Sequence, residues 1–328
     1  MKFRRFRNRI AVLLHSSIFS LCILAGLSPM DVHGQDAPKM KSIVLIAGVP
    51  SHGYGAHEHF AGCRLLADVL QAGSKSVKCQ VIKDGWPEDD SILDQADTIV
   101  MYADGGGKHP AIPHMDRLQK HIDRGAGFVC IHYAVEVPAG EVGDKFKDWL
   151  GGYFEVDWSV NPHWIGEFKT LPDHSITRGV KPFATNDEWY FHMRFQDGMK
   201  GVTPILSAVP PATTMSRPDG HHSGNPTVRK EVAEGLPQHV AWAFDRKDGG
   251  RSFGFTGGHF HWNWGNPEMQ RLVSNAILRT AKMDVPSTGF PCGPIDLKRL
   301  QENQDYPVPA KFSEEATVKE FNLTVAKP

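Results

Sequence analysis

Cysteine is scarce in this sequence, and the few cysteines present are not arranged for crosslinking. The chain has 328 residues and five cysteines, with no Cys-x-x-Cys pair among them. Small secreted domains that depend on disulfides carry many more. We therefore expect neither a disulfide framework nor a thiolate zinc site. Cys130 lies inside an apolar run and is expected to be a buried, inert thiol.

An excess of charge of either sign is also missing. The sequence has 36 basic and 37 acidic residues, a formal net charge of -1, and no basic stripe or acidic block. Proteins that bind nucleic acid usually present clustered basic residues. We therefore expect no nucleic-acid partner, whereas a hydrophobic fraction of 41% is sufficient for a large core.

Two common catalytic motifs are absent. No GxSxG or GxCxG sequence is present, so the sharp turn that presents an acyl-enzyme nucleophile is not encoded. The glycine-rich stretch DGGGKHP, residues 104–110, lacks the Lys-Ser/Thr pair of a phosphate-binding loop. These absences disfavour acyl-enzyme chemistry, and we expect no nucleotide cofactor.

No apolar run is long enough to span a membrane comfortably. Residues 10–27 are apolar but are interrupted by His15, Ser16 and Ser17, whereas a span needs about 20 residues. Five basic residues precede this run, and Val32-His33-Gly34 follows it as a tolerable cleavage site. The pattern predicts a signal peptide at 1–34 and export to the periplasm or the extracellular space, with no membrane attachment after cleavage. An uncleaved membrane anchor is the alternative.

Short buried strands alternate with amphipathic helices in the first part of the chain. The predicted strands are 41–49, 77–82, 98–102 and 127–132, and helical spacing occurs around 63–70, at 113–124 and at 267–282. Such alternation predicts βαβ units and a parallel, doubly wound α/β sheet. We assign 35–283 to this domain.

The remaining segments predict a different kind of structure. Apolar and polar residues alternate over 164–208, which predicts antiparallel strands. Residues 240–244 and 252–256 predict the two strands of a β-hairpin. A short helix is expected at 145–154. Residues 210–235 are rich in Pro, Gly and Ser and are expected to form a surface excursion. The Pro-rich tail, 284–328, is expected to wrap the domain.

Imidazoles follow several of the predicted strands. His52, His57 and His59 follow the first strand, Asp104 and His109 the third, His132 the fourth, and His259 and His261 the last. In an open parallel sheet, ligands bind outside the carboxyl ends of the strands. We therefore expect these segments to form the walls of one shared pocket.

Imidazole at such an edge supports two chemistries. Neutral histidines such as His52, His132 and His259 could hold Zn²⁺ or Mn²⁺ with one position left open. Alternatively, His132 could act as a general base while Asp104 and His57 contact the substrate. A solvated loop histidine with no function is the alternative for each.

The stretch NDEWYFHMRF, 186–195, adds a carboxylate. As a strand, it would place Glu188 and His192 on one face and Trp189 on the other. Glu188 beside aromatic rings is a candidate acid/base with a raised pKa, supported by His192. An exposed edge strand with an ordinary salt bridge is the alternative.

Aromatic side chains next to polar groups suggest sugar binding. HFHWNW, 259–264, combines His261 with Trp262, and Trp189 lies in the stretch above. Aromatic faces can cover the apolar side of a sugar ring while polar groups bind its hydroxyls. We treat these three residues as candidate substrate contacts, with core packing as the equal alternative.

Four stretches of the sequence resemble the ThuA-like (trehalose utilisation) family, which is related in fold to class I glutamine amidotransferases. They are 43–59, GAGFVCIHYA at 125–134, PDHSITRGVKPFATNDEWY at 172–190, and GRSFGFTGGHFHWNWG at 250–265. The resemblance implies a flavodoxin-like sheet without the amidotransferase nucleophile. It also implies functional roles for His132, Glu188 and His259, and for His163 in NPHW as a further ligand. The sequence departs from many relatives at HFHWNW, which leaves the substrate in question.

Some relatives hold a divalent metal, and the family is linked to 3-keto-glycosides. The resemblance thus implies an enzyme that removes the C2 proton of such a sugar and cleaves the glycosidic bond by elimination or hydrolysis. The expected partner is a small carbohydrate. Two alternatives remain, which are a non-catalytic carbohydrate-binding or sensing module and a zinc hydrolase of esters or amides.

Overall fold

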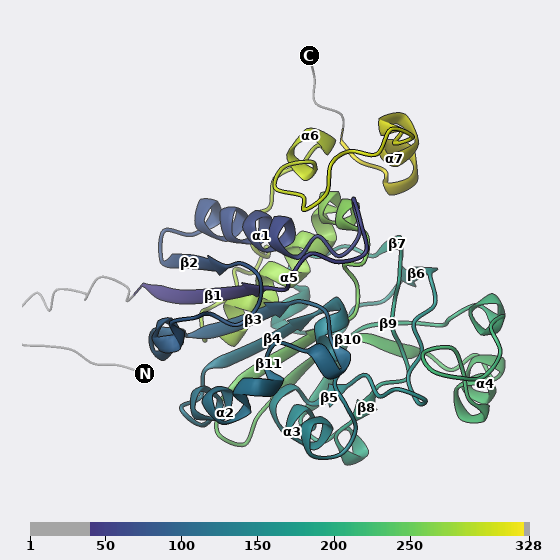
Figure 1. Cartoon of the computed structure of the whole chain (residues 1–328), viewed down its shortest axis with the longest axis horizontal. Helices are drawn as coiled ribbons and strands as arrows, with labels where there is room; N and C mark the ends of the chain where they lie inside the picture. The colour runs from purple at the N-terminus through teal and green to yellow at the C-terminus, as the bar shows by residue number, and fades with distance from the viewer. Residues whose placement is uncertain (1–39, 325–328) are drawn as a thin grey trace, which may run out of the picture. The chain divides into compact units, whose positions relative to one another are not determined.

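A seven-stranded sheet forms the centre of the protein in the computed structural model, which describes residues 40–324 (Figure 1). In spatial order its strands are β2 (Val77–Ile82), β1 (Lys41–Ala47), β3 (Thr98–Tyr102), β4 (Gly127–Ile131), β11 (Arg251–Phe255), β10 (Gln238–Asp245) and β9 (Val202–Ala208). β2, β1, β3, β4 and β11 are parallel, whereas β10 pairs antiparallel with both neighbours. The order of the parallel part is that of a flavodoxin-like doubly wound fold. The predicted α/β class and its added antiparallel segment are confirmed.

Helices cover the sheet on both sides (Figure 1). They are α1 (His59–Gly73), α2 (Met115–Asp123), α3 (Glu141–Leu150), α4 (Pro226–Ala233), α5 (Pro267–Thr280), α6 (Leu297–Leu300) and α7 (Glu314–Phe321). α1 and α5 pack together on one face, and α2 and α3 lie on the other. Short 3-10 helices connect these elements: η1 Asp90–Gln95, η2 Gly106–Lys108, η3 Ile112–His114, η4 His132–Val135, η5 Ser175–Thr177, η6 Asp197–Met199, η7 Ala212–Met215 and η8 His261–Gly265.

The alternation of side chains along each strand produces two separate cores. In β1, Ile43 and Leu45 face the α1 and α5 side, whereas Val44 and Ile46 face α2 and α3. Because both faces are covered, the central strands are apolar over most of their length, which is why they read as continuous hydrophobic runs. These runs made β1 to β4 predictable to within about two residues.

Two small antiparallel pairs lie beside the sheet. β5 (Gly152–Tyr153) pairs with β8 (Arg194–Phe195), and β6 (Trp164–Phe168) pairs with β7 (Phe183–Asp187). The predicted strand over 186–195 is therefore wrong, because β7 ends at Asp187 and the chain turns before β8. His192 adopts a left-handed conformation with φ of 60° within this turn, so the alternation of faces expected of a strand does not apply.

The predicted excursion 210–235 contains regular structure that the composition did not indicate. η7 and α4 both lie within it. Asn225 caps α4 by accepting hydrogen bonds from the N–H groups of Thr227 and Val228, and Pro226 occupies the first helical turn. An Asn-Pro pair is a helix-start signal that could have identified this helix.

Residues 284–324 lie against the 3-10 helix η8. α6 and α7 both contact η8, and Leu300 and Leu323 approach Gly265 closely. The predicted signal peptide at 1–34 lies outside the described residues. Within 40–324, no helix has the length and apolar character needed to cross a bilayer. The cysteines described here, Cys63, Cys79, Cys130 and Cys292, are all free, and Cys130 is buried as expected.

Candidate metal centre

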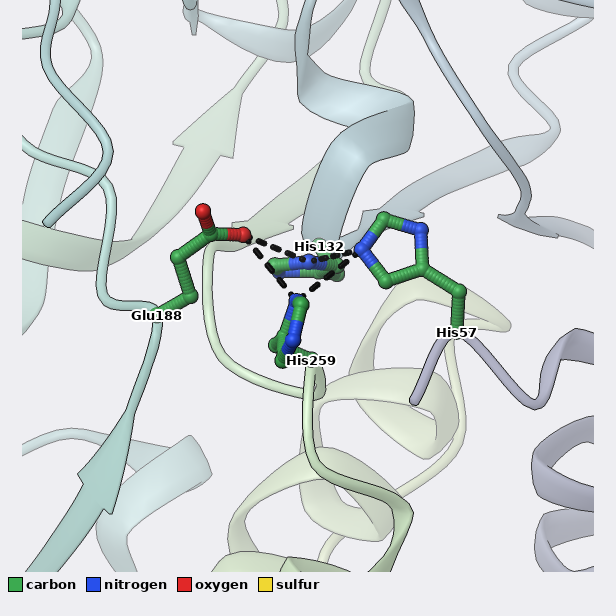
Figure 2. Close-up of side chains that lie close together, drawn as sticks. All are labelled: His57, His132, Glu188 and His259. Atoms are coloured by element: carbon green, nitrogen blue, oxygen red, sulfur yellow. Dashed lines mark hydrogen bonds and ion pairs between the residues drawn. The ribbon is translucent and has the colours of Figure 1, made fainter. Parts of the chain in front are cut away.

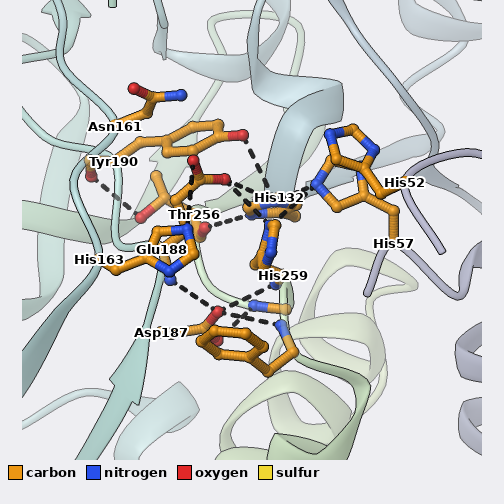
Figure 3. A network of polar contacts seen from close by, with 12 residues as sticks. His52, His57, His132, Asn161, His163, Asp187, Glu188, Tyr190, Thr256 and His259 are labelled. Atoms are coloured by element: carbon orange, nitrogen blue, oxygen red, sulfur yellow. Dashed lines mark hydrogen bonds and ion pairs between the residues drawn. The ribbon is translucent and has the colours of Figure 1, made fainter. Parts of the chain in front are cut away.

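Five separate segments bring polar side chains to the carboxyl edge of the sheet. His57 follows β1, Asp104 follows β3, His132 begins directly after β4, His259 follows β11 and Glu188 follows β7. The side chains of His57, His132, His259 and Glu188 point toward one another in Figures 2 and 3. The sheet topology brings imidazoles from distant parts of the chain to one edge, as the sequence predicted.

Three of the histidines at this edge have strained backbones. His52, His57 and His132 have φ values of 65°, 50° and 56°. Non-glycine residues rarely adopt this left-handed region, and they tend to do so at functional sites. His132 is the first residue of η4, directly after β4, which is the strand-to-helix position at which α/β-hydrolases place a nucleophile. An imidazole stands at that position here.

A compact group of four side chains, which we call the His3Glu cluster, consists of His57, His132, Glu188 and His259. Their ligand atoms all lie within 4.8 Å of one another. His57 Nε2 lies 3.0 Å from His132 Nε2 and 3.1 Å from His259 Nδ1. Glu188 Oε2 lies 3.1 Å from His259 Nδ1 and 3.5 Å from His132 Nε2. Figure 2 shows that these contacts connect all four residues.

Asp104 fixes the tautomer of His57. Its Oδ1 accepts a hydrogen bond of 2.7 Å from His57 Nδ1. Burial lowers the pKa of His57 to about 2, against the opposing effect of this hydrogen bond. Burial alone would raise the pKa of Asp104, but the hydrogen bond from His57 and the nearby imidazole of His59 bring it to about 2. His57 is therefore a neutral imidazole whose Nε2 lone pair points into the cluster.

His132 is oriented in the same way by a backbone carbonyl. Its Nδ1 donates to the carbonyl oxygen of Thr256 at 2.8 Å, which leaves Nε2 of the neutral ring as an acceptor. The Tyr190 hydroxyl lies 3.3 Å from this Nε2. Tyr190 was not identified as a site residue from the sequence, because its neighbours suggested a strand.

Glu188 is ionised, contrary to the expectation from the sequence. Burial would raise its pKa, but the surrounding imidazoles of His132, His163 and His259 outweigh burial and hold the pKa well below the usual range. The expected raised pKa is therefore wrong, because the surrounding imidazoles were not accounted for. Glu188 is therefore a carboxylate that is available as a ligand or as a base.

Asp187, the residue before Glu188, holds the His259 loop in place. It is fully buried, and its carboxylate accepts hydrogen bonds from the backbone N–H groups of Gly258, His259 and Phe260 and from the Asn263 amide. Figure 3 shows Asp187 below the cluster, with its contacts to the His259 loop. The sequence analysis did not identify Asp187, although an acidic residue beside the candidate catalytic glutamate was a visible signal.

The donor set fits a divalent metal ion. The Nε2 lone pairs of His57 and His132 face each other at 3.0 Å, an arrangement that is repulsive unless a proton or a cation lies between them. Ligand atoms around tetrahedral zinc, with bonds of about 2.0–2.1 Å, lie roughly 3.3 Å apart, close to the spacings of the cluster. Nitrogen-rich sites suit zinc, and the carboxylate also suits manganese. Asp104 and the Thr256 carbonyl provide the outer hydrogen bonds that typically orient metal-bound imidazoles.

Two predicted metal ligands lie at the edge of the His3Glu cluster. The His52 ring stacks on that of His57 at 3.5 Å between centroids, and it forms a second possible ligand group with His57 and Asp104. His163 Nε2 lies 3.6 Å from Glu188 Oε1, its ring packs edge-on against that of His259 at 4.8 Å between centroids, and its side chain is 48% exposed. His57 and Glu188, which were assigned other roles from the sequence, are inside the cluster.

The remaining candidates are placed elsewhere. His192 stacks on Trp158 and donates to its carbonyl oxygen, with Glu231 3.5 Å from the other ring nitrogen. Trp189 is fully buried against Phe168 and Phe255. His261 is 1% exposed and Trp262 6% exposed, and both belong to the packing around η8. The structure does not bring these four residues to the cluster.

Comparison with known proteins now identifies the family. The ThuA family model, described as trehalose utilisation, matches residues 44–278. This chain belongs to the ThuA family. The match includes every residue of the His3Glu cluster.

A solved ThuA-like protein shares the fold. A putative ThuA-like protein from Bacteroides uniformis ATCC 8492 is 16% identical with a TM-score of 0.51, and the match covers 76% of this chain and 94% of that one. A second, from Parabacteroides merdae ATCC 43184, is 12% identical with a TM-score of 0.49, covering 76% and 92%. Comparison with curated proteins finds no match. Membership of the ThuA family relates the chain to trehalose utilisation.

Proposed function

We propose that this ThuA family protein is an exported, metal-dependent enzyme that cleaves the glycosidic bond of 3-keto-glycosides. The observation that carries the proposal is the His3Glu cluster, whose carboxylate Oε2 faces the imidazoles while Oε1 faces a polar cavity. The cavity is about 280 Å³, close to the lower end of the range for small-molecule sites, roughly 300–1,000 Å³. Export is proposed from the N-terminal sequence pattern.

The chemistry of a 3-keto-sugar suits a site without a nucleophile. The ketone at C3 acidifies the C2 proton, so an enolate can form without any covalent bond to the protein. A divalent ion held by the cluster would supply Lewis acidity that favours negative charge on the ketone oxygen. The turn after β4 carries His132 in place of serine or cysteine, which accords with this route.

Glu188 and His163 are placed to move the protons. Glu188 Oε1 removes the C2 proton, the enolate collapses to a C1=C2 double bond, and the bond from C1 to the leaving oxygen breaks. His163 Nε2–H, 3.6 Å from the same carboxylate, protonates that oxygen. Water then adds across the double bond. Its hydroxide joins C1, its proton returns to His163, and Glu188 returns a proton to C2, which regenerates the 3-keto-sugar.

Metal analysis and turnover together test the proposal. Purified protein should contain about one zinc or manganese ion per chain and should release the aglycone from a 3-keto-glucoside. His132→Ala should abolish both, whereas His114→Ala should change neither, because His114 stacks on Trp86 before α2 and takes no part in the cluster. Sugar binding without turnover in the metal-loaded protein would reject the enzyme in favour of a binding module. Turnover of simple esters or amides alone would reject the keto-sugar substrate.

A further inference from the structure

The polar cavity beside Glu188 is formed by two distant parts of the chain. Its polar lining comes from Asn161, His163 and Glu188 on one side and from Thr213, Ser216 and Arg217 on the other. The second group belongs to the excursion 210–235, which the sequence alone did not connect with the site. The excursion is therefore one wall of the cavity rather than a remote surface loop.

Several hydrogen bonds hold this wall in place. Arg217 Nη2 donates to Asn161 Oδ1 at 2.8 Å and to the carbonyl oxygen of His222 at 2.9 Å. The Asn161 N–H donates to the same carbonyl oxygen at 3.0 Å. The His222 ring lies 3.0 Å from the buried carboxylate of Glu136, beyond η4. The excursion is thus tied both to the loop that carries His163 and to the sheet edge.

A second, larger cavity adjoins the first. It measures about 850 Å³, lies along β6 and the end of β9, and shares His163 and Thr213 with the cavity beside Glu188. Ile165 and Val209 line it and are 59% and 54% exposed, which is unusual for large apolar side chains. The two cavities together form a trough that is polar at Glu188 and partly apolar farther out.

The position of His163 decides how a substrate lies in this trough. It stands where the cavities meet, and under the proposed function its Nε2 protonates the glycosidic oxygen. That oxygen joins the keto-sugar to its leaving group, so the two parts of the substrate must lie on opposite sides of His163. The sugar ring then lies beside Glu188, and the leaving group lies over Ile165 and Val209.

We propose that the β6–β9 cavity is a leaving-group subsite that selects glycosides whose leaving group is a ring with an apolar face, such as an aryl group or a second sugar. This inference rests on the proposed function and adds the substrate class to it. A methyl leaving group is too small to reach Ile165 and Val209, so these residues should affect selectivity rather than the chemical step.

Paired substrates test the subsite. Methyl, phenyl and glucosyl 3-keto-glucosides are compared in the wild-type chain and in Ile165→Asp and Val209→Asp, with Val308→Asp as a control on the tail, where Val308 is 55% exposed. Each charge beside the bound ring should lower kcat/KM for the phenyl compound about tenfold and leave the methyl compound within about twofold. Val308→Asp should change neither. A loss of kcat/KM on the phenyl compound but not on the glucosyl compound would identify an aryl site. A loss on the glucosyl compound but not on the phenyl compound would identify a sugar site.

The outcomes separate this inference from the function on which it rests. Equal effects on methyl and ring substrates, or no effect on either, would overturn the subsite while leaving the enzyme in place. No turnover of any 3-keto-glucoside by the metal-loaded wild-type chain would reject the proposed function itself. Thermal melting of each variant checks that the substitutions, which lie on the surface, leave the fold intact.

Discussion

The Nε2 atoms of His57 and His132 lie 3.0 Å apart, although the other nitrogen of each ring donates a hydrogen bond and fixes both Nε2 atoms as acceptors. Two acceptors at this distance repel each other unless a proton or a cation lies between them. The cluster could therefore hold a cation, and the acceptors that orient His57 and His132 would support the same arrangement. The two acceptors, Asp104 and the Thr256 carbonyl, directly follow β3 and β11. The order of strands in the sheet therefore places each acceptor beside the imidazole that it orients.

Asp104→Asn should weaken metal binding without unfolding the protein. An amide beside His57 Nδ1 no longer favours the N–H tautomer as the carboxylate does, and outer hydrogen-bond partners of metal ligands typically contribute about 10–100-fold to affinity. Competition with a chromogenic chelator should show a loss of that size. Asp173→Asn, at an exposed position before η5, is the control and should bind metal normally. Unchanged affinity in Asp104→Asn would show that Asp104 does not orient a ligand.

Asp187 and Glu188 are adjacent, but substitution of Asp187 should mainly lower stability, whereas substitution of Glu188 should mainly remove activity. Asp187→Asn replaces an acceptor of backbone N–H groups with a donor inside the core, which should cost roughly 2–4 kcal/mol of unfolding free energy. Glu188→Gln should abolish turnover with a smaller loss of stability, because it removes a charge that the imidazoles stabilise but leaves the hydrogen bonds to the His259 loop in place. Urea unfolding of the two metal-free variants distinguishes them. Equal stability losses would mean that Asp187 has no special role in holding the His259 loop.

The parts of the fold that could be predicted are those determined by local pattern. Residues 43–47 of β1 and most of β3 and β4 are apolar because both sheet faces are covered there, and the edge at which His132 and His259 meet follows from strand direction alone. The turn at 188–193 could not be predicted. Its alternating side chains satisfy a strand pattern, but β7 ends at Asp187, whose carboxylate accepts a hydrogen bond from the backbone N–H of Gly258 in the His259 loop.

The roles within the site were harder to predict than its location. His57 lies just before α1, where an ordinary helix start would expose it, and only its contact with Asp104 turns it inward. His261 would share a strand face with His259 and Trp262 would lie on the opposite face, but both belong to η8 and are buried. These differences depend on contacts between residues far apart in the chain, which periodicity does not report.

The tail should support the His57 loop. Gln304 Oε1 accepts the Gly55 N–H at 3.0 Å, and Phe312 packs edge-on against Tyr54 and stacks on Trp262. Phe312→Ala should therefore cost about 1–2 kcal/mol and increase amide hydrogen exchange across 52–59. Val308→Ala, on the same tail but 55% exposed, is the matched control. Unaltered exchange in the loop would show that the tail packs there without supporting it.

Acid should destabilise the protein partly through His174, and a single substitution should reduce the effect. His174 Nδ1 accepts the Ile176 N–H at the start of η5. Burial, with repulsion from Arg279 and Arg178, lowers its pKa to about 4. The folded pKa is below the unfolded value of about 6.5, so stability is complete above pH 6.5 and is lost as the pH falls toward 4. Because the ring is only about half buried, we expect its share of the loss to be about 1–2 kcal/mol.

His174→Asn tests this assignment, because asparagine is among the preferred helix-capping residues and does not titrate. The variant should match the wild type at pH 7.5 within about 0.5 kcal/mol, since the cap is kept. At pH 4.5 its unfolding free energy should exceed that of the wild type by about 1 kcal/mol, since no proton is taken up on unfolding at this position. His221→Asn, whose imidazole is 75% exposed, should show the wild-type pH dependence. Parallel curves for His174→Asn and the wild type between pH 7.5 and 4.5 would place the acid sensitivity in other histidines.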